Sequence, residues 1–144
     1  MDAQLMQLLD EAPDAVLISD LEGIIRFWNR GAELIFGYTA AEALGKSLDL
    51  IIPENLRARH WDGYWRVMNS GETKYKTGLL SAPGLRKDAS RVSLEFSMIL
   101  LHDSSGAISG CGTIMRDVTE RFQREKELKE LLNACETKPA VTTT

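Results

Sequence analysis

The sequence predicts an α+β fold in which an antiparallel sheet carries short helices on one face. Three observations predict it: apolar strands occur near both ends of the chain, short helices separate the two groups, and turns join neighbouring strands. Antiparallel pairing follows, because parallel strands need a crossover connection of about a dozen residues.

The first elements are a helix and a hairpin. Residues 1–12 form an amphipathic helix, which ends at Pro13 because proline cannot continue the backbone ladder. Strands are expected over residues 15–20 and 24–29, with a turn at Gly23 between them. The apolar stripe of the helix consists of Leu5, Met6, Leu8 and Leu9.

Short helices occupy the middle of the chain. Asn29 caps the segment RGAELIFG, which ends at Gly37. Thr39 and Glu42 have the spacing of a capping box at the start of the next helix. A longer helix is predicted over residues 54–70, because a glycine follows it directly.

Three strands and a charged helix complete the prediction. The strands are expected over residues 73–80, 89–101 and 107–117, followed by a linker helix over 119–136 and a disordered tail over 137–144. The second strand has the clearest pattern, because its apolar residues alternate with mostly polar ones. Its apolar face consists of Val92, Leu94, Phe96, Met98 and Leu100.

The composition indicates one folded domain, over residues 13–118, in a chain of 144 residues. Its net charge of −4 argues against binding to nucleic acid. No apolar run approaches the roughly 20 residues of a membrane span, and the acidic start does not resemble a secretory signal. The two cysteines, Cys111 and Cys135, form no CxxC pair, so we expect a reduced, cytoplasmic protein.

The sequence gives no catalytic constellation. Its two histidines lie far apart, and it contains no nucleophile elbow, phosphate-binding loop or HExxH motif. We therefore expect a protein that is not an enzyme.

Four segments together resemble a PAS domain: DAVLISDLEGIIRFWN, GYTAAEALGKSL, RKDAS and IMRDVTER. The resemblance covers roughly residues 5–120. It implies a five-stranded antiparallel sheet, a cleft for a small molecule, and a homodimer formed through the flanking helices. It also implies that Asp117 and Thr119 tie the sheet to the outgoing helix, which would signal to a separate output protein.

One face of the helix 54–70 places a histidine toward the sheet. Stepping by helical spacing from Leu56 gives His60, Gly63, Tyr64 and Val67 on that face. A neutral imidazole is a good iron ligand, and a single histidine often holds haem iron. Gly63 leaves room where a flat macrocycle would lie.

The strand 89–101 supplies a possible second iron ligand. If its apolar face lines the cleft, Met98 projects toward the same space as His60, and a thioether can bind haem iron. The candidate metal ligands are therefore His60 and Met98. The other side chains expected to contact the cofactor are Tyr64, Tyr75, Leu80, Leu94, Phe96 and Ile114.

The segment RARHWDGYWRVMNSGE resembles the corresponding helix of FixL-type haem PAS sensors. That resemblance implies haem b with His60 as the proximal iron ligand. The position of the arginine that binds oxygen in the FixL type falls at Leu80, so the gas could be CO, NO or O₂, or the signal a redox change. RcoM-type regulators, a second group that this chain resembles, imply a displaceable methionine, a role that Met98 would suit.

Two other interpretations stay open. A cofactor-free PAS module would fill its cleft with its own side chains and act in dimerisation or signal relay through residues 2–11 and 118–135. A flavin or another organic ligand is also compatible with the aromatic wall. The reactive-cysteine flavin type is disfavoured, because residues 29–70 contain no cysteine.

Overall fold

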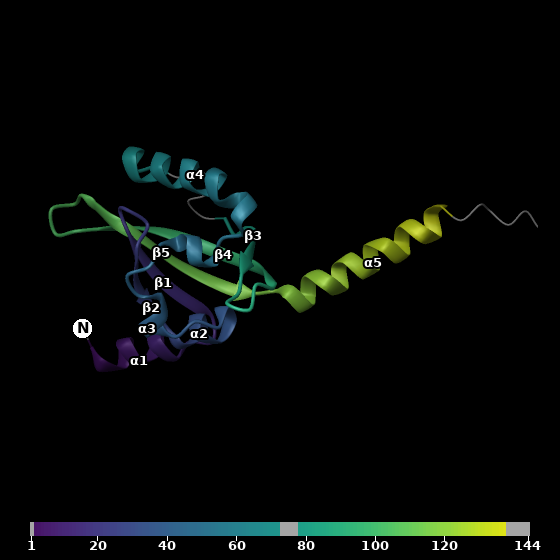
Figure 1. The fold of residues 1–144 in the computed structure, drawn as a ribbon, viewed down its shortest axis with the longest axis horizontal. Coiled ribbons are helices and arrows are strands. Elements are labelled where there is room, and N and C mark those ends of the chain that lie inside the picture. The colour runs from purple at the N-terminus through teal and green to yellow at the C-terminus, as the bar shows by residue number, and fades with distance from the viewer. Residues whose placement is uncertain (1, 73–77, 138–144) are drawn as a thin grey trace, which may run out of the picture.

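The computed structural model describes residues 2–72 and 78–137. They form a five-stranded antiparallel sheet in the order β2-β1-β5-β4-β3, with short helices against it and a helix at each end (Figure 1). The α+β class and the five-stranded sheet are confirmed. The elements are α1 (Ala3–Glu11), β1 (Ala15–Asp20), β2 (Ile25–Trp28), α2 (Arg30–Phe36), α3 (Ala40–Ala43), η1 (Leu48–Ile51), η2 (Glu54–Leu56), α4 (Arg57–Ser70), β3 (Leu80–Leu85), β4 (Arg91–His102), β5 (Ile108–Asp117) and α5 (Thr119–Thr137).

The short helices begin and end where the capping residues predict. The Asn29 side chain accepts a hydrogen bond from the Ala32 amide at the start of α2, and Gly37 ends that helix with φ of 84°. Thr39 and Glu42 form the complete capping box of α3. Local sequence therefore fixes the path of the chain across the sheet before any long-range packing.

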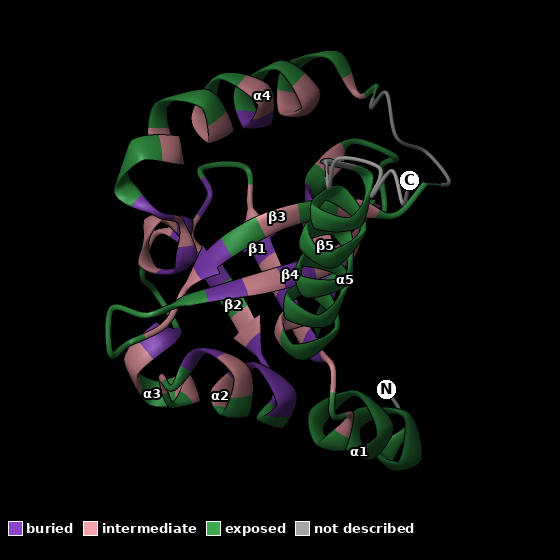
Figure 2. Ribbon diagram, turned by 90° about the vertical axis from the view of Figure 1, so that its right-hand side faces the viewer, coloured by how far each residue is buried: buried purple, intermediate pink, exposed green. Residues whose placement is uncertain are grey.

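The core lies between one face of the sheet and the helices that cover it. Along β1, β4 and β5, alternate residues face this core, as the two-residue period of a strand requires. Figure 2 shows the buried residues gathered in the strands and short helices. The largest buried side chains of the core include Phe36, Leu17, Ile25 and Val92.

The strand expected over residues 73–80 is displaced. The structure places β3 at Leu80–Leu85, so the expected range shares only Leu80 with it, and the expectation was wrong for residues 78 and 79. Pro83 and Gly84 read as strand breakers, but β3 is an edge strand, where proline costs no ladder hydrogen bond. Residues 73–77, including Tyr75, lie outside the described residues.

The two terminal helices lie away from the core. α1 is exposed along its length, although Asn29 Nδ2 donates to the Leu9 carbonyl at 2.8 Å and holds its end. α5 projects from the sheet as a single rod (Figure 1), and residues 120–136 are exposed. α5 includes Thr137, the first residue of the predicted tail; residues 138–144 lie outside the described residues. Among the described helices, none has the length and apolarity to cross a membrane.

Candidate functional site

A cavity of about 180 Å³ lies between the inner face of the sheet and the helices η1, η2 and α4. Its wall is mainly apolar, with contributions from β1, β3, β4 and β5. A groove of about 610 Å³ adjoins it beside α4. The cavity and the groove share four lining residues: His60, Tyr64, Phe96 and Met98.

His60 projects from α4 into the wall shared by the cavity and the groove. Its ring packs edge-on against Trp61, with centroids 4.8 Å apart, and lies 5.7 Å from the ring of Tyr64. Its Nδ1 atom is buried and has no hydrogen-bond partner in the described part of the chain. Burial lowers the pKa of His60, against an opposing contribution from the charge of Asp49. The imidazole is therefore neutral near pH 7, which is the form that binds a metal.

Tyr64, one helical turn after His60, ties α4 to the sheet. Its hydroxyl donates to the backbone carbonyl of Asp20 and lies 3.0 Å from the Oγ of Ser19. Burial raises the pKa of Tyr64 to about 12. The phenol therefore stays protonated and keeps its hydrogen bond to the carbonyl throughout the neutral range.

Trp61 provides a second attachment of α4. Its indole nitrogen donates to Asp49 Oδ1 at 2.6 Å, and its ring packs on the turn between β1 and β2. That turn contains Gly23 with φ of 79°, where an added Cβ would lie 2.2 Å from the Trp61 ring. Trp65, which stacks on Trp61 at 5.2 Å, is largely exposed.

The structure brings most of the predicted site residues together. Leu94, Phe96 and Met98 of β4 line the cavity with His60 and Tyr64, so Met98 and His60 face one space from the sheet and the helix. Leu80 lies beside this cavity and lines the adjoining groove. Tyr75 cannot be placed, since it lies outside the described residues.

Ile114 does not line the cavity, so its assignment to the cofactor site is corrected. It pairs with Ser97 and Val16 on the outer face of the sheet and is 41% exposed. Its neighbours Thr113 and Met115 face the cavity instead, because side chains alternate along β5.

Polar residues of the cavity wall were missed by the sequence analysis. Ser19, Cys111 and Thr113 are all buried and line the cavity. Cys111 lies 3.8 Å from Thr113 Oγ1, and burial raises the pKa of its thiol. For Cys111 and Thr113, the signal that could have found them is the alternation with Gly110 and Gly112, which places the two glycines on the opposite face of β5.

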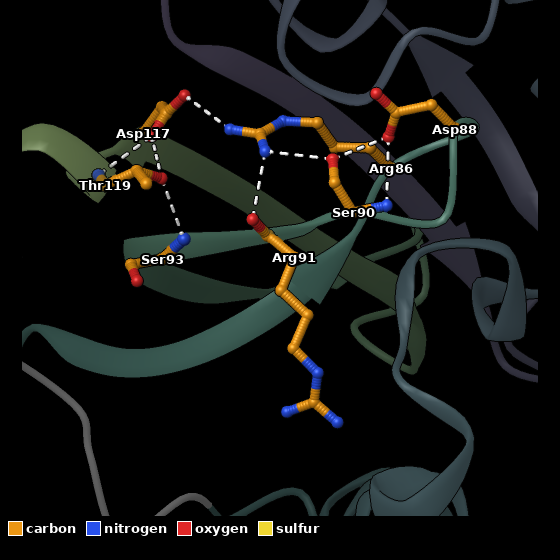
Figure 3. Close-up of polar contacts among 7 residues, drawn as sticks. All are labelled: Arg86, Asp88, Ser90, Arg91, Ser93, Asp117 and Thr119. Atoms are coloured by element: carbon orange, nitrogen blue, oxygen red, sulfur yellow. Dashed lines mark hydrogen bonds and ion pairs between the residues drawn. The ribbon is translucent and has the colours of Figure 1, made fainter.

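A second set of contacts joins the sheet to α5 (Figure 3). Asp117 at the end of β5 accepts hydrogen bonds from the amide and hydroxyl of Thr119. The Thr119 hydroxyl accepts in turn from the Ser93 amide of β4 at 3.0 Å. Arg86 after β3 lies 3.4 Å from Asp117 Oδ2 and donates to the Arg91 carbonyl at 2.9 Å. β4 and β5 therefore both contact the first residue of α5, and the residue after β3 reaches Asp117.

The charges at this junction depend on one another. Burial alone would raise the pKa of Asp117, but hydrogen bonds from Thr119 and the charge of Arg86 bring it below its ordinary value. Arg121 in α5 forms an ion pair with Glu95 of β4. Glu95 lies between Leu94 and Phe96, whose side chains line the cavity, so β4 contacts both the cavity and α5.

Two curated proteins are similar to most of this chain. "Sensor protein FixL" of Bradyrhizobium diazoefficiens is 29% identical over 131 residues, which are 90% of this chain and 25% of that protein. "Oxygen sensor protein DosP" of Escherichia coli is 26% identical over 121 residues, which are 83% of this chain and 15% of that protein. The chain thus spans a quarter or less of the length of these relatives.

Solved structures share the fold. The PAS domain of a protein from Colwellia psychrerythraea superposes with a TM-score of 0.71 and 21% identity, covering 81% of this chain and 96% of that one. The PAS domain of BvgS from Bordetella pertussis gives 0.62 and 20%, covering 92% and 99%. A family model described as PAS fold matches residues 9–123. The chain therefore belongs to the PAS fold family.

Proposed function

We propose that this PAS domain binds haem b through His60 and senses a diatomic gas or the redox state of the iron. The observation that carries the proposal is the position of the His60 imidazole, which lies where the cavity and the groove meet and faces the same space as Met98. The relatives named as a sensor and as an oxygen sensor support the same class of function.

The residues present fit a haem group. Ligand pockets usually measure about 300–1,000 Å³, so the cavity alone is small, but the cavity and the adjoining groove together lie in that range. Gly63 adds open space beside His60, because a Cβ there would meet nothing within 4 Å. When bound, haem would supply an iron centre that takes up CO, NO or O₂. Met98 is the candidate for the second axial ligand.

Signalling would pass from β4 and β5 into α5. The same strands line the cavity and hold Asp117, Glu95 and their partners in α5. The junction of β4 and β5 with α5 would need two arrangements. To act as a signal, gas binding or a change in iron oxidation state must change the free-energy difference between these two arrangements. A displacement of β4 at Phe96 would shift Glu95, the adjacent residue, against Arg121.

The proposal includes a homodimer that signals to an output protein and has no catalytic activity of its own. The flanking helices leave apolar side chains exposed, among them Leu8 of α1 and Leu128 and Leu132 of α5. Exposed apolar patches of this kind favour association. Both cysteines are free, as is usual in the reducing cytoplasm, where we place the protein.

Haem titration tests this function. The full chain is expected to take up one haem and to develop a Soret band, and His60→Ala is expected to weaken uptake by at least about tenfold. His102→Ala is the matched control, because His102 is the other histidine and lies exposed at the end of β4. Equal uptake by all three proteins, or no uptake by the wild type, would contradict the proposal.

A further inference from the structure

The enclosed nitrogen of His60 determines how the ring could hold iron. Nδ1 is buried by protein atoms, so a metal cannot approach it, and Nε2 is the nitrogen left for binding. In a neutral imidazole the proton then lies on Nδ1. Metal-binding histidines almost always donate that proton to a carboxylate, a carbonyl or water, which raises the basicity of the ligand. Among residues 2–72 and 78–137, Nδ1 of His60 has no such partner.

The carboxylate whose charge acts on His60 is that of Asp49, and it already has other partners. Asp49 influences His60 electrostatically, but its Oδ1 accepts from the Trp61 indole at 2.6 Å and lies 3.9 Å from the Arg57 guanidinium. The imidazole is held by the rings of Trp61 and Tyr64 instead. Ring packing fixes its position but supplies no acceptor for the proton on Nδ1.

We propose that His60 is a weakly bound, displaceable iron ligand, and that the sensor therefore responds most strongly to NO. This inference rests on the proposed haem function. An imidazole whose second nitrogen has no acceptor donates less electron density to the metal than one that is hydrogen-bonded. Of the three gases, NO most strongly weakens the bond on the opposite side of the iron. Release of His60 would free α4 from the bound group, while Tyr64 would still attach the helix to β1 and Trp61 would still attach it to η1.

A variant that supplies an acceptor tests the inference directly. Leu56 precedes His60 by four residues and lines the same cavity, so Leu56→Gln is expected to bring an amide oxygen within reach of the proton on Nδ1. Leu56→Met is the matched control, with a similar volume and no amide. In haem-loaded, reduced protein, the iron–histidine stretching frequency should be lower in the wild type and Leu56→Met than in Leu56→Gln. Leu56→Gln should also hold haem about tenfold more tightly than Leu56→Met.

Nitric oxide provides the decisive comparison. It is expected to detach His60 in the wild type and in Leu56→Met and to leave it bound in Leu56→Gln, as read from the absorption and Raman spectra. Retention of His60 in the wild type would overturn this inference and leave the haem function intact. Failure of the wild type to take up haem would overturn both.

Haem-free protein gives an independent reading. His60→Leu removes a buried nitrogen that has no partner, so the thermal midpoint is expected to stay unchanged or to rise. A fall of about 4 °C or more that His60→Phe, which keeps a ring against Trp61 and Tyr64, does not restore would mean that the imidazole makes a stabilising hydrogen bond in solution, and would overturn the inference.

Discussion

The hydroxyl of Tyr64 on α4 lies 3.0 Å from the Oγ of Ser19 on β1, and it gives its single proton to the carbonyl of Asp20. Ser19 must therefore donate to Tyr64. Both side chains are buried, so this pair is a polar link between the sheet and the helix that carries His60. The position of His60 over the cavity depends on it.

Removal of the Tyr64 hydroxyl should loosen α4. Tyr64→Phe keeps the ring but leaves Ser19 and the Asp20 carbonyl without their partner, so we expect a loss of about 1–3 kcal/mol in the free energy of unfolding, measured in urea. Ser19→Ala removes only one of the two hydrogen bonds and should cost less. A larger cost for Ser19→Ala than for Tyr64→Phe would contradict this account.

Because Trp61 packs against Gly23, substitution of this glycine by alanine should lower the free energy of unfolding more than the same substitution at Gly45, which has similar backbone geometry. Gly45 also has positive φ, at 83°, but an added Cβ would meet nothing within 4 Å. Gly45→Ala should therefore cost only the backbone strain of about 1–2 kcal/mol. Gly23→Ala should cost more and alter tryptophan fluorescence, because the ring must move. Equal costs in urea unfolding would show that the contact is unimportant.

The sequence predicts the elements with strong local signals. The capping residues Asn29, Thr39 and Glu42 locate α2 and α3 correctly, because they satisfy backbone groups within a few residues. The helical period also places His60 and Tyr64 on the inward face of α4. These features depend on local geometry, which the sequence determines without knowledge of the tertiary fold.

The features that were missed depend on position within the sheet. Pro83 is acceptable in β3 only because that strand lies at the edge, and no local pattern states which strand is at the edge. The error at Ile114 is one of phase: a shift by one residue moves a side chain to the other face. The enclosure of His60 Nδ1 depends on the packing of separate elements and has no signature in the sequence.

The junction at Asp117 should weaken in acid. Because the carboxyl has a lowered pKa in the folded protein, its contribution is present above about pH 4 and is lost as the pH falls below that value. Asp117→Asn should flatten this dependence and speed amide exchange in the first turn of α5, with less than about 1 kcal/mol lost because solvent screens the pair.

Asp88→Asn serves as the control for that experiment. Asp88 accepts from Ser90 in the same loop and belongs to the network without contacting α5 (Figure 3). Asp88→Asn should leave amide hydrogen exchange in α5 unchanged. If both variants speed exchange equally, the effect comes from the loop and not from the link between Asp117 and Thr119.

The two cysteines offer a test of dimerisation through α5. Cys135 is exposed on that helix, whereas Cys111 is buried in the cavity wall. If two α5 helices pair in parallel, mild oxidation should link the chains through Cys135, and Cys135→Ser should abolish the product while Cys111→Ser should not. A monomer in sedimentation equilibrium, with no linked product, would contradict the proposed dimer.

The central claim is that the imidazole at position 60 holds iron, and absorption spectra of ferric, ferrous and CO-bound protein test it most directly. The wild type should give a histidine-ligated haem spectrum in each state. His60→Ala should lose that spectrum and regain it when free imidazole is added. A His60→Ala spectrum identical to that of the wild type in all three states would contradict the claim.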